Sequence, residues 1–291
     1  MQPSNGRLKI AIQKDGRITD ESIGLLKAMG LDFDIRSRAL FSPCRNFPLD
    51  ILAVRDDDIP EYVQDSVSEF GVVGENIVVE KEAQVEIVHR LGFGKCRLAI
   101  CVPRGGKIAN LAGLNGKRVA TSYPRTVRKF FRDERIEAEV VEISGSVEIT
   151  PALDVADATC DIISTGSTAR MNGLEVIHTI MSSEAVLITS STANKSPEQL
   201  RSVEQLLTRF RSVLNARGKK YVMMNAPADA VETIKRLVPG MNSPTVVPLT
   251  QPNMVAIHSV VAENVFWEVM EKLKEAGASD IIAVNIEKIV R

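Results

Sequence analysis

A run of hydroxyl side chains around one glycine follows a short apolar stretch in the second half of the chain. Asp161-Ile162-Ile163 is typical of the end of a strand, and Ser164-Thr165-Gly166-Ser167-Thr168 comes directly after it. Hydroxyl and backbone N–H donors there can bind one anion together, and a glycine lets the backbone approach it closely. An ordinary strand–turn–helix with a Ser or Thr cap has the same residues. The local sequence alone favours neither interpretation.

Three carboxylates lie before this loop. Asp157 and Asp161 could contact sugar hydroxyls or a magnesium ion, because hard cations prefer oxygen ligands. Glu148 follows Ser144-Gly145-Ser146-Val147 near the expected start of a helix. A capping role for Glu148 therefore competes with a role as a metal ligand.

Charged residues also follow the first two expected strands. Lys14-Asp15-Gly16-Arg17 comes after the first strand, and Arg55-Asp56-Asp57-Asp58 after the second. Ligands of open α/β sheets gather at the carboxyl ends of strands, where Lys and Arg can neutralise phosphates. Taken alone, Lys14–Arg17 is better interpreted as a solvated turn. Asp58 is most simply the N-cap of the helix that Ile59-Pro60 begins, whereas the roles of Asp56 and Asp57 stay open.

Two further strand ends carry polar side chains. Glu75-Asn76 follows the buried run Gly71–Gly74, and Ser122-Tyr123-Pro124 follows Arg118–Thr121. The Tyr123 ring and the neighbouring hydroxyls are expected to face a ligand cleft.

Composition limits the classes of protein to which the chain can belong. With 44% hydrophobic and 25% charged residues among 291, it has the composition of a soluble globular protein. The net charge of −1 counts against a nucleic-acid binder, and no apolar run has the length of a membrane span. Residues 1–9 lack the pattern of a secretory signal, so we expect a cytoplasmic protein. The four cysteines have no zinc-site spacing and are expected to be small apolar fillers.

Apolar runs alternate with amphipathic stretches along the chain, which predicts an α/β fold. We expect a discontinuous lobe of residues 1–97 and 182–219, a second lobe of residues 98–181, and a third domain of residues 220–291. The expected strands are 8–12, 50–55, 71–74, 97–102, 118–121, 139–143, 160–164, 221–224, 245–249, 255–261 and 281–286. The run 174–188 is expected to be a strand that crosses back into the first lobe. The expected helices begin near 19 and 59 and cover 126–134, 147–155, 197–217, 229–237 and 264–276, with Phe266, Trp267, Met270 and Leu273 in the core.

The third domain has the order β-α-β-β-α-β, which is that of a ferredoxin-like module. The first two lobes, joined by two crossings, would enclose a cleft that can close over a ligand.

Taken together, these segments resemble the long form of the ATP phosphoribosyltransferase family, over nearly the whole chain. The matching segments are Gln13–Arg17, Arg55–Pro60, Gly71–Asn76, Gly116–Pro124, Gly145–Glu148, Glu148–Ala169, Tyr221–Met224, Pro244–Val246 and Phe266–Glu268. The family signature lies in Glu148–Ala169, where this chain departs from the usual pattern at Asp154, Thr159 and Ala169. Asp154 replaces a glycine, so the loop entry is the part of the geometry that it could alter.

The resemblance implies a two-lobed core like the type II periplasmic-binding-protein fold, followed by a ferredoxin-like (ACT-like) regulatory domain. It implies that N1 of ATP attacks C1′ of phosphoribosyl pyrophosphate and releases pyrophosphate, with Mg²⁺ as cofactor. The residues implied to bind phosphoribosyl pyrophosphate are Asp157, Asp161, Ser164, Thr165, Gly166, Ser167 and Thr168. Those implied to bind ATP are Lys14, Gly16, Arg17, Arg55, Glu75 and Tyr123, and Glu148 is the candidate metal ligand. No residue is assigned as a general base.

By the same resemblance, histidine inhibits the enzyme from the C-terminal domain, and the chain forms a hexamer in exchange with dimers. Neither nucleic acid nor a membrane is an expected partner. Two other hypotheses fit part of the pattern. One is a solute-binding protein with two lobes, and the other is a non-catalytic paralogue that binds the ligands without turnover.

Overall fold

The computed structural model describes residues 6–35, 40–190, 196–241 and 243–291. The chain divides into two compact units, residues 1–202 and 203–291. This division falls within helix α6 (Pro197–Ala216), whereas the sequence predicts a domain boundary at residue 220. The end of α6 belongs to the second unit, within which Ser212 O accepts the Ile289 N–H and Asn215 O accepts a hydrogen bond from Lys219.

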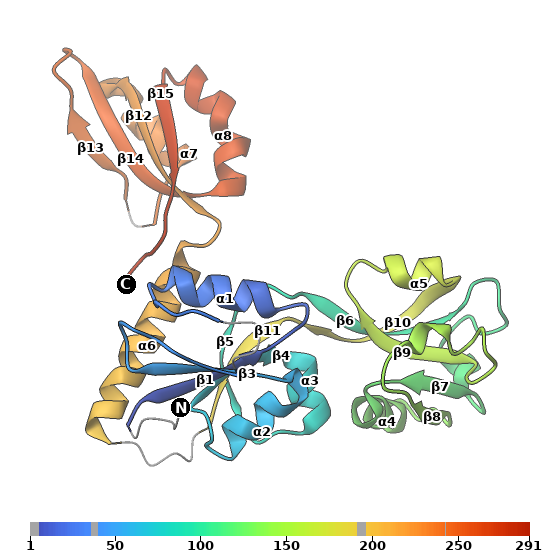
Figure 1. Ribbon diagram of the computed structural model, residues 1–291. Helices are drawn as coiled ribbons and strands as arrows, with labels where there is room; N and C mark the ends of the chain where they lie inside the picture. The colour runs from blue at the N-terminus through green and yellow to red at the C-terminus, as the bar shows by residue number, and fades with distance from the viewer. Residues whose placement is uncertain (1–5, 36–39, 191–195, 242) are drawn as a thin grey trace. The chain divides into compact units, whose positions relative to one another are not determined.

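The first sheet has the order β2-β3-β1-β4-β11-β5. Its strands are β1 (Leu8–Gln13), β2 (Phe41–Pro43), β3 (Leu49–Val54), β4 (Phe70–Gly74), β5 (Glu86–Arg90) and β11 (Ala185–Thr189). β1 runs parallel to β3 and β4, and β11 runs antiparallel to β4 and β5. Helix α1 (Thr19–Ala28) covers one face, and α2 (Ile59–Gln64) and α3 (Glu75–Lys81) cover the other (Figure 1). Burial on both faces explains why β4 is apolar along its whole length.

The second sheet has the order β10-β6-β9-β7-β8. Its strands are β6 (Cys96–Pro103), β7 (Arg118–Thr121), β8 (Glu139–Glu142), β9 (Ala158–Ile163) and β10 (Leu174–Ser183). Helix α4 (Pro124–Asp133) packs on one face through Val127 and Phe131. The short helix α5 (Ser167–Met171) packs on the other face through Ala169.

The chain passes between the two sheets twice, from β5 to β6 and from β10 to β11 (Figure 1). The expected long strand 174–188 is therefore two strands, which separate at Glu184 and belong to different sheets. Each of the two sheets, with the helices that pack on it, forms one lobe of the first unit.

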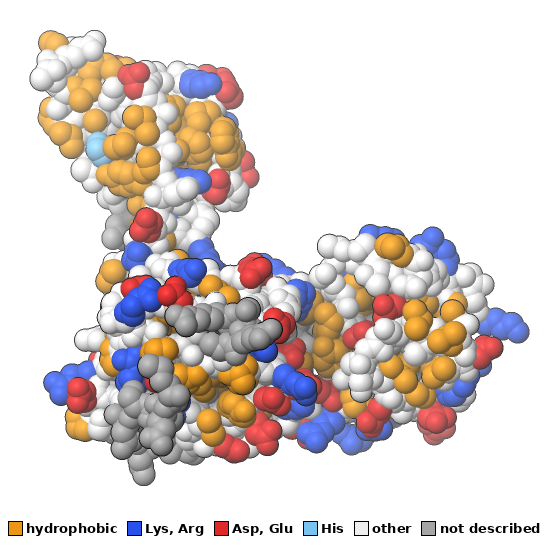
Figure 2. Space-filling view, viewed as in Figure 1, with side chains coloured by type: hydrophobic (Ala, Val, Ile, Leu, Met, Phe, Trp, Pro, Cys, Tyr) orange, Lys and Arg blue, Asp and Glu red, His pale blue; other side chains and the backbone are white. Residues whose placement is uncertain are grey.

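The C-terminal unit is a four-stranded antiparallel sheet of order β13-β14-β12-β15 with two helices. Its elements are β12 (Lys219–Pro227), α7 (Val231–Leu237), β13 (Thr245–Pro248), β14 (Met254–Ala262), α8 (Glu263–Glu275) and β15 (Ser279–Asn285). This confirms the predicted β-α-β-β-α-β order and the ferredoxin-like class. The helices cover one sheet face, and hydrophobic side chains that include Val247, Ile282 and Val284 are exposed on the other (Figure 2).

Two local expectations were wrong. Residues 147–155 form only a 3₁₀ turn, η3 (Val147–Ile149), followed by further turns, because Pro151 has no N–H to continue a helix and Asp154 takes a left-handed φ of 54°. Trp267 is 69% exposed, while Phe266 and Leu273 are buried. One residue turns a helix by about 100°, so the buried stripe runs through Phe266, Met270 and Leu273 and leaves Trp267 outside.

Other elements went unrecognised in the sequence. The structure adds β2, β5, the helix α3, and the 3₁₀ turns η1 (Asp56–Asp58), η2 (Leu111–Leu114) and η4 (Ala228–Ala230). Asp58 occupies the N-cap position of α2 as expected, but its side chain makes no capping hydrogen bond. None of the four cysteines, all of which the structure describes, forms a disulfide, and all four are buried.

Candidate active site

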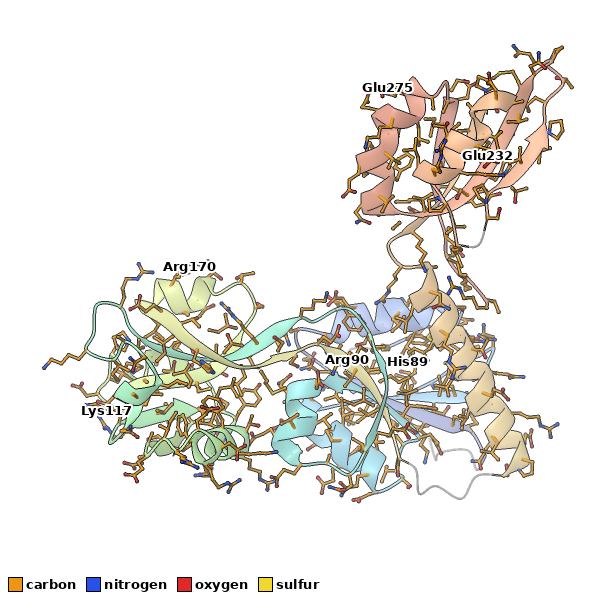
Figure 3. All side chains as sticks on the ribbon, turned by 180° about the vertical axis from the view of Figure 1, so that it is seen from behind. His89, Arg90, Lys117, Arg170, Glu232 and Glu275 are labelled. Carbon is orange, nitrogen blue, oxygen red and sulfur yellow. The ribbon has the colours of Figure 1, made fainter. Side chains whose placement is uncertain are left out.

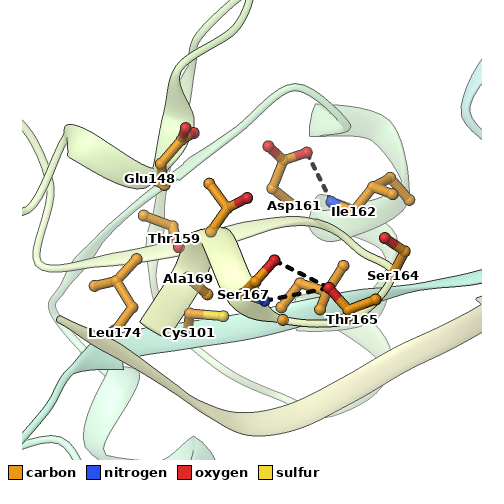
Figure 4. Close-up of a pocket in the computed structure, with 13 residues that line it drawn as sticks. Cys101, Glu148, Thr159, Asp161, Ile162, Ser164, Thr165, Ser167, Ala169 and Leu174 are labelled. Atoms are coloured by element: carbon orange, nitrogen blue, oxygen red, sulfur yellow. Dashed lines mark hydrogen bonds between the residues drawn. The ribbon is translucent and has the colours of Figure 1, made fainter. Parts of the chain in front are cut away.

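A cavity of about 110 Å³ lies at the end of β9, between the strand and α5 (Figure 4). It is lined by every residue of the Ser164–Thr168 loop, together with Asp161 and Glu148. The full lining is Cys101, Glu148, Thr159, Asp161, Ile162, Ile163, Ser164, Thr165, Gly166, Ser167, Thr168, Ala169 and Leu174. We call this cavity the loop pocket.

The loop turns at Gly166, which has a φ of +74°. A Cβ at this position would meet Arg170 Nη1 at 3.3 Å and Ile163 Cγ2 at 3.6 Å. The Thr165 and Ser167 hydroxyls lie 3.0 Å apart, and Thr165 Oγ1 accepts the Ser167 N–H at 3.4 Å (Figure 4). The backbone therefore needs a glycine here, and the neighbouring donors are already turned toward one another.

Asp161 is a carboxyl group whose pKa is altered by burial in the loop pocket. Burial raises the pKa of its carboxyl to about 6, and the charge of Glu148 adds to that effect. The Ile162 N–H donates to Asp161 Oδ1 at 2.8 Å and opposes the rise in pKa (Figure 4). Near neutral pH this carboxyl is ionised but can gain a proton at little cost.

Asp157 does not line the loop pocket. Its Oδ2 atom accepts the backbone N–H of Arg118 at 2.9 Å and lies 3.6 Å from Arg118 Nε. These contacts join the start of β9 to the start of β7. The Asp157 carboxylate is thus engaged at the opposite end of the strand from the loop.

A second, larger hollow of about 500 Å³ lies between the two lobes of the first unit. Its lining residues are Asp56, Asp57, Ile77, Glu80, Lys81, Thr121, Ser122, Tyr123, Pro124, Arg125, Glu142, Ile143, Ser144 and Gly145. We call it the inter-lobe hollow. It contains one of the predicted ATP residues, Tyr123.

The Tyr123 hydroxyl is held neutral in this hollow. Burial raises its pKa well above the usual range, and the carboxylates of Asp161 and Asp56 add to the rise. The hydroxyl oxygen accepts a hydrogen bond from Asn76 Nδ2 at 3.3 Å. Tyr123 can therefore donate a hydrogen bond to an acceptor at any physiological pH.

The remaining predicted ATP residues surround the ends of β1, β3 and β4 but line neither cavity. Arg17 donates to Lys95 O and to Cys96 Sγ, each at 3.2 Å. Glu75 forms an ion pair with Arg90. Arg90 lies on β5 in the first sheet (Figure 3). Lys14 donates its N–H to Val54 O, and Arg55 immediately precedes η1.

Gly16 has a φ of +142°, and a Cβ there would lie 2.2 Å from Gln13 Nε2. That amide nitrogen donates to Asp56 Oδ2 at 3.2 Å. The Gly16 turn thus fixes a contact between the end of β1 and a residue that lines the inter-lobe hollow.

Several cavity residues were missed in the sequence. Thr159 and Cys101 line the loop pocket because β6 and β9 pair Cys101 with Thr159, and Thr159 shares a strand face with Asp161. The alternation of side chains along β9 could have revealed Thr159. Cys101 could not be found that way, because its place depends on the pairing of its own strand, β6, with β9. Burial raises the pKa of the Cys101 thiol to about 11, so it stays protonated.

The carboxylates of Glu148 and Asp161 are the acidic groups of the loop pocket. Among residues 6–35, 40–190, 196–241 and 243–291, no three His, Cys, Asp or Glu side chains form a group that could hold a metal ion by themselves. Within the same ranges, no helix combines the length and apolar character needed to cross a membrane.

Comparison with known proteins gives the family. The model of the family described as ATP phosphoribosyltransferase matches residues 55–212, and the model described as HisG, C-terminal domain, matches residues 216–288. The chain belongs to the ATP phosphoribosyltransferase family. It is 46% identical to the ATP phosphoribosyltransferase of Cytophaga hutchinsonii over 284 residues, which covers 98% of this chain and 99% of that protein. It is 43% identical to the enzyme of Bacteroides thetaiotaomicron over 283 residues, with 97% and 99% covered.

Among solved structures, the ATP phosphoribosyl transferase (HisG:HisZ) complex from Thermotoga maritima contains a similar chain. The TM-score is 0.60 at 23% identity, and the match covers 70% of this chain and 98% of that one. This likeness supports the two-lobed fold. The family resemblance seen in the sequence is therefore confirmed. The chain is a pentosyltransferase of the family that performs the first step of histidine biosynthesis.

Proposed function

We propose that this chain transfers the phosphoribosyl group of phosphoribosyl pyrophosphate to N1 of ATP, with the loop pocket holding the ribose 5-phosphate. The observation that carries this assignment is the convergence of Asp161, Glu148 and the whole Ser164–Thr168 segment on one cavity. In the reaction, the bond from C1′ to the pyrophosphate oxygen breaks and a bond from N1 to C1′ forms.

The loop binds and orients the donor substrate. Backbone N–H groups and hydroxyls of Ser164–Thr168 donate to the 5-phosphate, and Gly166 leaves room for the phosphate to approach. The ionised Asp161 carboxylate accepts hydrogen bonds from ribose hydroxyls. Fixing the ribose in this way aligns C1′ with the attacking nitrogen, and orientation of two bound substrates supplies much of the acceleration that this chemistry needs.

The inter-lobe hollow is proposed to hold ATP. Tyr123 offers a neutral hydroxyl there, and Lys14, Gly16, Arg17, Arg55 and Glu75 are proposed to contact ATP or the departing pyrophosphate from the strand ends. Asp157 is proposed only to hold the start of β9, where Arg118 engages it.

The loop pocket suits Mg²⁺ bound together with substrate phosphates. Mg²⁺ is usually held by one or two carboxylates plus phosphate oxygens, and Glu148 and Asp161 lie close enough for their charges to interact. These two carboxylates are the residues that would hold the ion. When bound, it would neutralise charge that develops on the leaving pyrophosphate.

The C-terminal unit is proposed to bind histidine as a feedback inhibitor and to support a hexamer in exchange with dimers. The match of residues 216–288 to the C-terminal domain of the family supports this proposal. The exposed apolar sheet face around Val247, Ile282 and Val284 also supports it, because exposed apolar patches mark interaction surfaces. Inhibition requires histidine to bind one quaternary state better than another.

Pyrophosphate release tests the proposal directly. The full chain, incubated with ATP, phosphoribosyl pyrophosphate and Mg²⁺, should release pyrophosphate and form the N1-phosphoribosyl adduct in equal amounts. Omission of either substrate is the control. Binding of both substrates without turnover would instead support a non-catalytic paralogue.

A further inference from the structure

The last turn of α3 meets the first turn of α4, although the two helices belong to different lobes. Glu80 of α3 is 8% exposed, and its carboxylate accepts three hydrogen bonds from α4. The Arg125 N–H donates to Oε1 at 2.9 Å, and the Thr126 N–H and hydroxyl donate to Oε2 at 2.9 and 2.7 Å. A buried carboxylate of one lobe therefore caps a helix of the other.

This cap replaces one that the local sequence of α4 does not supply. The first N–H groups of a helix are normally satisfied by a side chain just before it, but Tyr123 at the N-cap makes no such bond. The positive end of the helix also favours a carboxylate at this place. Because three donors converge on one ion, Glu80 fixes the position of the first turn of α4 closely.

Two further contacts join the same elements. Asn76 lies one turn before Glu80 on α3, and its amide donates to the Tyr123 hydroxyl at 3.3 Å. The Arg125 guanidinium donates to Lys81 O at 3.4 Å. Asn76 and Glu80 share one helix face because residues four apart lie above one another. This face of α3 thus holds both the ring of Tyr123 and the backbone that follows it.

We propose that Glu80 is a positioning residue that ties the two lobes together and sets the place of Tyr123 in the inter-lobe hollow. The proposal rests on the assignment of this hollow to ATP. Tyr123 and Pro124 directly precede the two capped N–H groups, so a shift of the α4 start moves the Tyr123 hydroxyl with it. Both Glu80 and Tyr123 line the hollow, whereas neither lines the loop pocket. Loss of Glu80 should therefore affect ATP much more than phosphoribosyl pyrophosphate.

Steady-state kinetics of the full chain test this division. Glu80→Ala should lower kcat/KM for ATP about 10- to 100-fold, the range for hydrogen bonds to a charged group. The KM for phosphoribosyl pyrophosphate should change less than about threefold. Glu80→Gln keeps one carbonyl oxygen and should give a smaller loss. The matched control is Glu82→Gln, which changes an exposed glutamate two positions away and should leave the kinetics unchanged.

A distance measurement tests the role of Glu80 in tying the two lobes together, independently of which substrate each cavity binds. Cysteines introduced at the exposed positions Glu61 and Lys107, one in each lobe, can carry spin labels, because the four natural cysteines are buried. The inter-label distance distribution should be narrow in the parent chain and broader in Glu80→Ala. If the parent released no pyrophosphate but the distribution still broadened, the assigned function would fail and the tie between the lobes would stand.

Three outcomes would overturn the proposal. The first is a folded Glu80→Ala chain with parental kinetics and an unchanged distance distribution. The second is an equal loss for both substrates, which would indicate general destabilisation. If Glu80→Ala does not fold, Glu80→Gln is measured in its place. The third outcome is a folded Glu80→Gln chain whose kinetics with ATP equal those of the parent.

Discussion

Glu148 and Asp161 line one pocket from two different segments, and the charge of Glu148 adds to the burial that raises the pKa of Asp161 to about 6. A carboxylate with this pKa changes its charge just below neutral pH. Its ability to accept hydrogen bonds from a sugar changes in the same range.

Activity should therefore rise with pH through the pKa of Asp161. Only the ionised carboxylate accepts hydrogen bonds from ribose hydroxyls on both oxygens, so kcat/KM for phosphoribosyl pyrophosphate should increase between about pH 5 and pH 7. Asp161→Asn should lower kcat/KM at pH 7.5 by more than about tenfold and remove this acid limb. The pH profile checks both effects, with Asp133→Asn, an exposed carboxylate at the end of α4, as the control. If the decrease in kcat/KM at acid pH persists in Asp161→Asn, another group must be responsible for it.

Asp161 should also make the fold less stable at neutral pH than in mild acid. The ordinary pKa of an Asp carboxyl is about 3.9, below the folded value of about 6 for Asp161. Between these two pH values the native state therefore binds more protons than the unfolded state. The contribution of this group to the free energy of unfolding is consequently lost as the pH rises from about 4 to 6. Asp161→Asn should be more stable than the parent at pH 7 by about 1–3 kcal/mol. Urea unfolding at pH 4.5 and pH 7 measures the free energy of unfolding of both chains. A difference between Asp161→Asn and the parent that is equal at the two pH values would contradict this prediction.

Replacement of Gly166 by Val should abolish binding of phosphoribosyl pyrophosphate while the chain stays folded. A β-branched residue is strained at the φ of +74°, and its Cβ would lie 3.3 Å from Arg170 Nη1. The loop must then move away from its present shape. Isothermal titration with the substrate measures the effect, and Gly24→Ala in α1, where a Cβ meets open space, is the control. Unchanged binding in Gly166→Val would refute the assignment of the loop.

Much of this arrangement is visible in the sequence because it is local. The strand before Ser164 and the loop after it are contiguous, so the pattern of apolar and hydroxyl residues predicts both. The contacts of Glu80 could not be predicted, because they join helices 45 positions apart through pairings that only the folded lobes create. Trp267 was misplaced because it follows Phe266 directly, and an apolar pair in a helix does not reveal which member faces the core.

Gly16→Ala should weaken ATP binding by about tenfold. The new Cβ would lie 2.2 Å from Gln13 Nε2, which must leave Asp56, and the φ of +142° adds strain. Displacing Gln13 frees the end of β1 and changes the edge of the inter-lobe hollow at Asp56. The control is Gly116→Ala, where φ is also positive at +70° but no atom lies within 4 Å of the Cβ. Equal ATP affinities for the two variants would show that strain alone, and not the Gln13 contact, determines any effect.

Removal of residues 216–291 should relieve inhibition by histidine. Truncation after Asn215 removes β12 to β15 and leaves both cavities of the first unit with their lining residues, all of which precede residue 175. Pyrophosphate release by the truncated chain should be insensitive to histidine at concentrations that inhibit the parent. The truncation also ends the chain inside α6, so the size of the assembly must be measured alongside by light scattering. Inhibition that persists in a chain of unchanged assembly size would place the effector site in the first unit. Loss of inhibition together with a smaller assembly would indicate that histidine acts through subunit contacts, because an effector inhibits only through the state that it binds better.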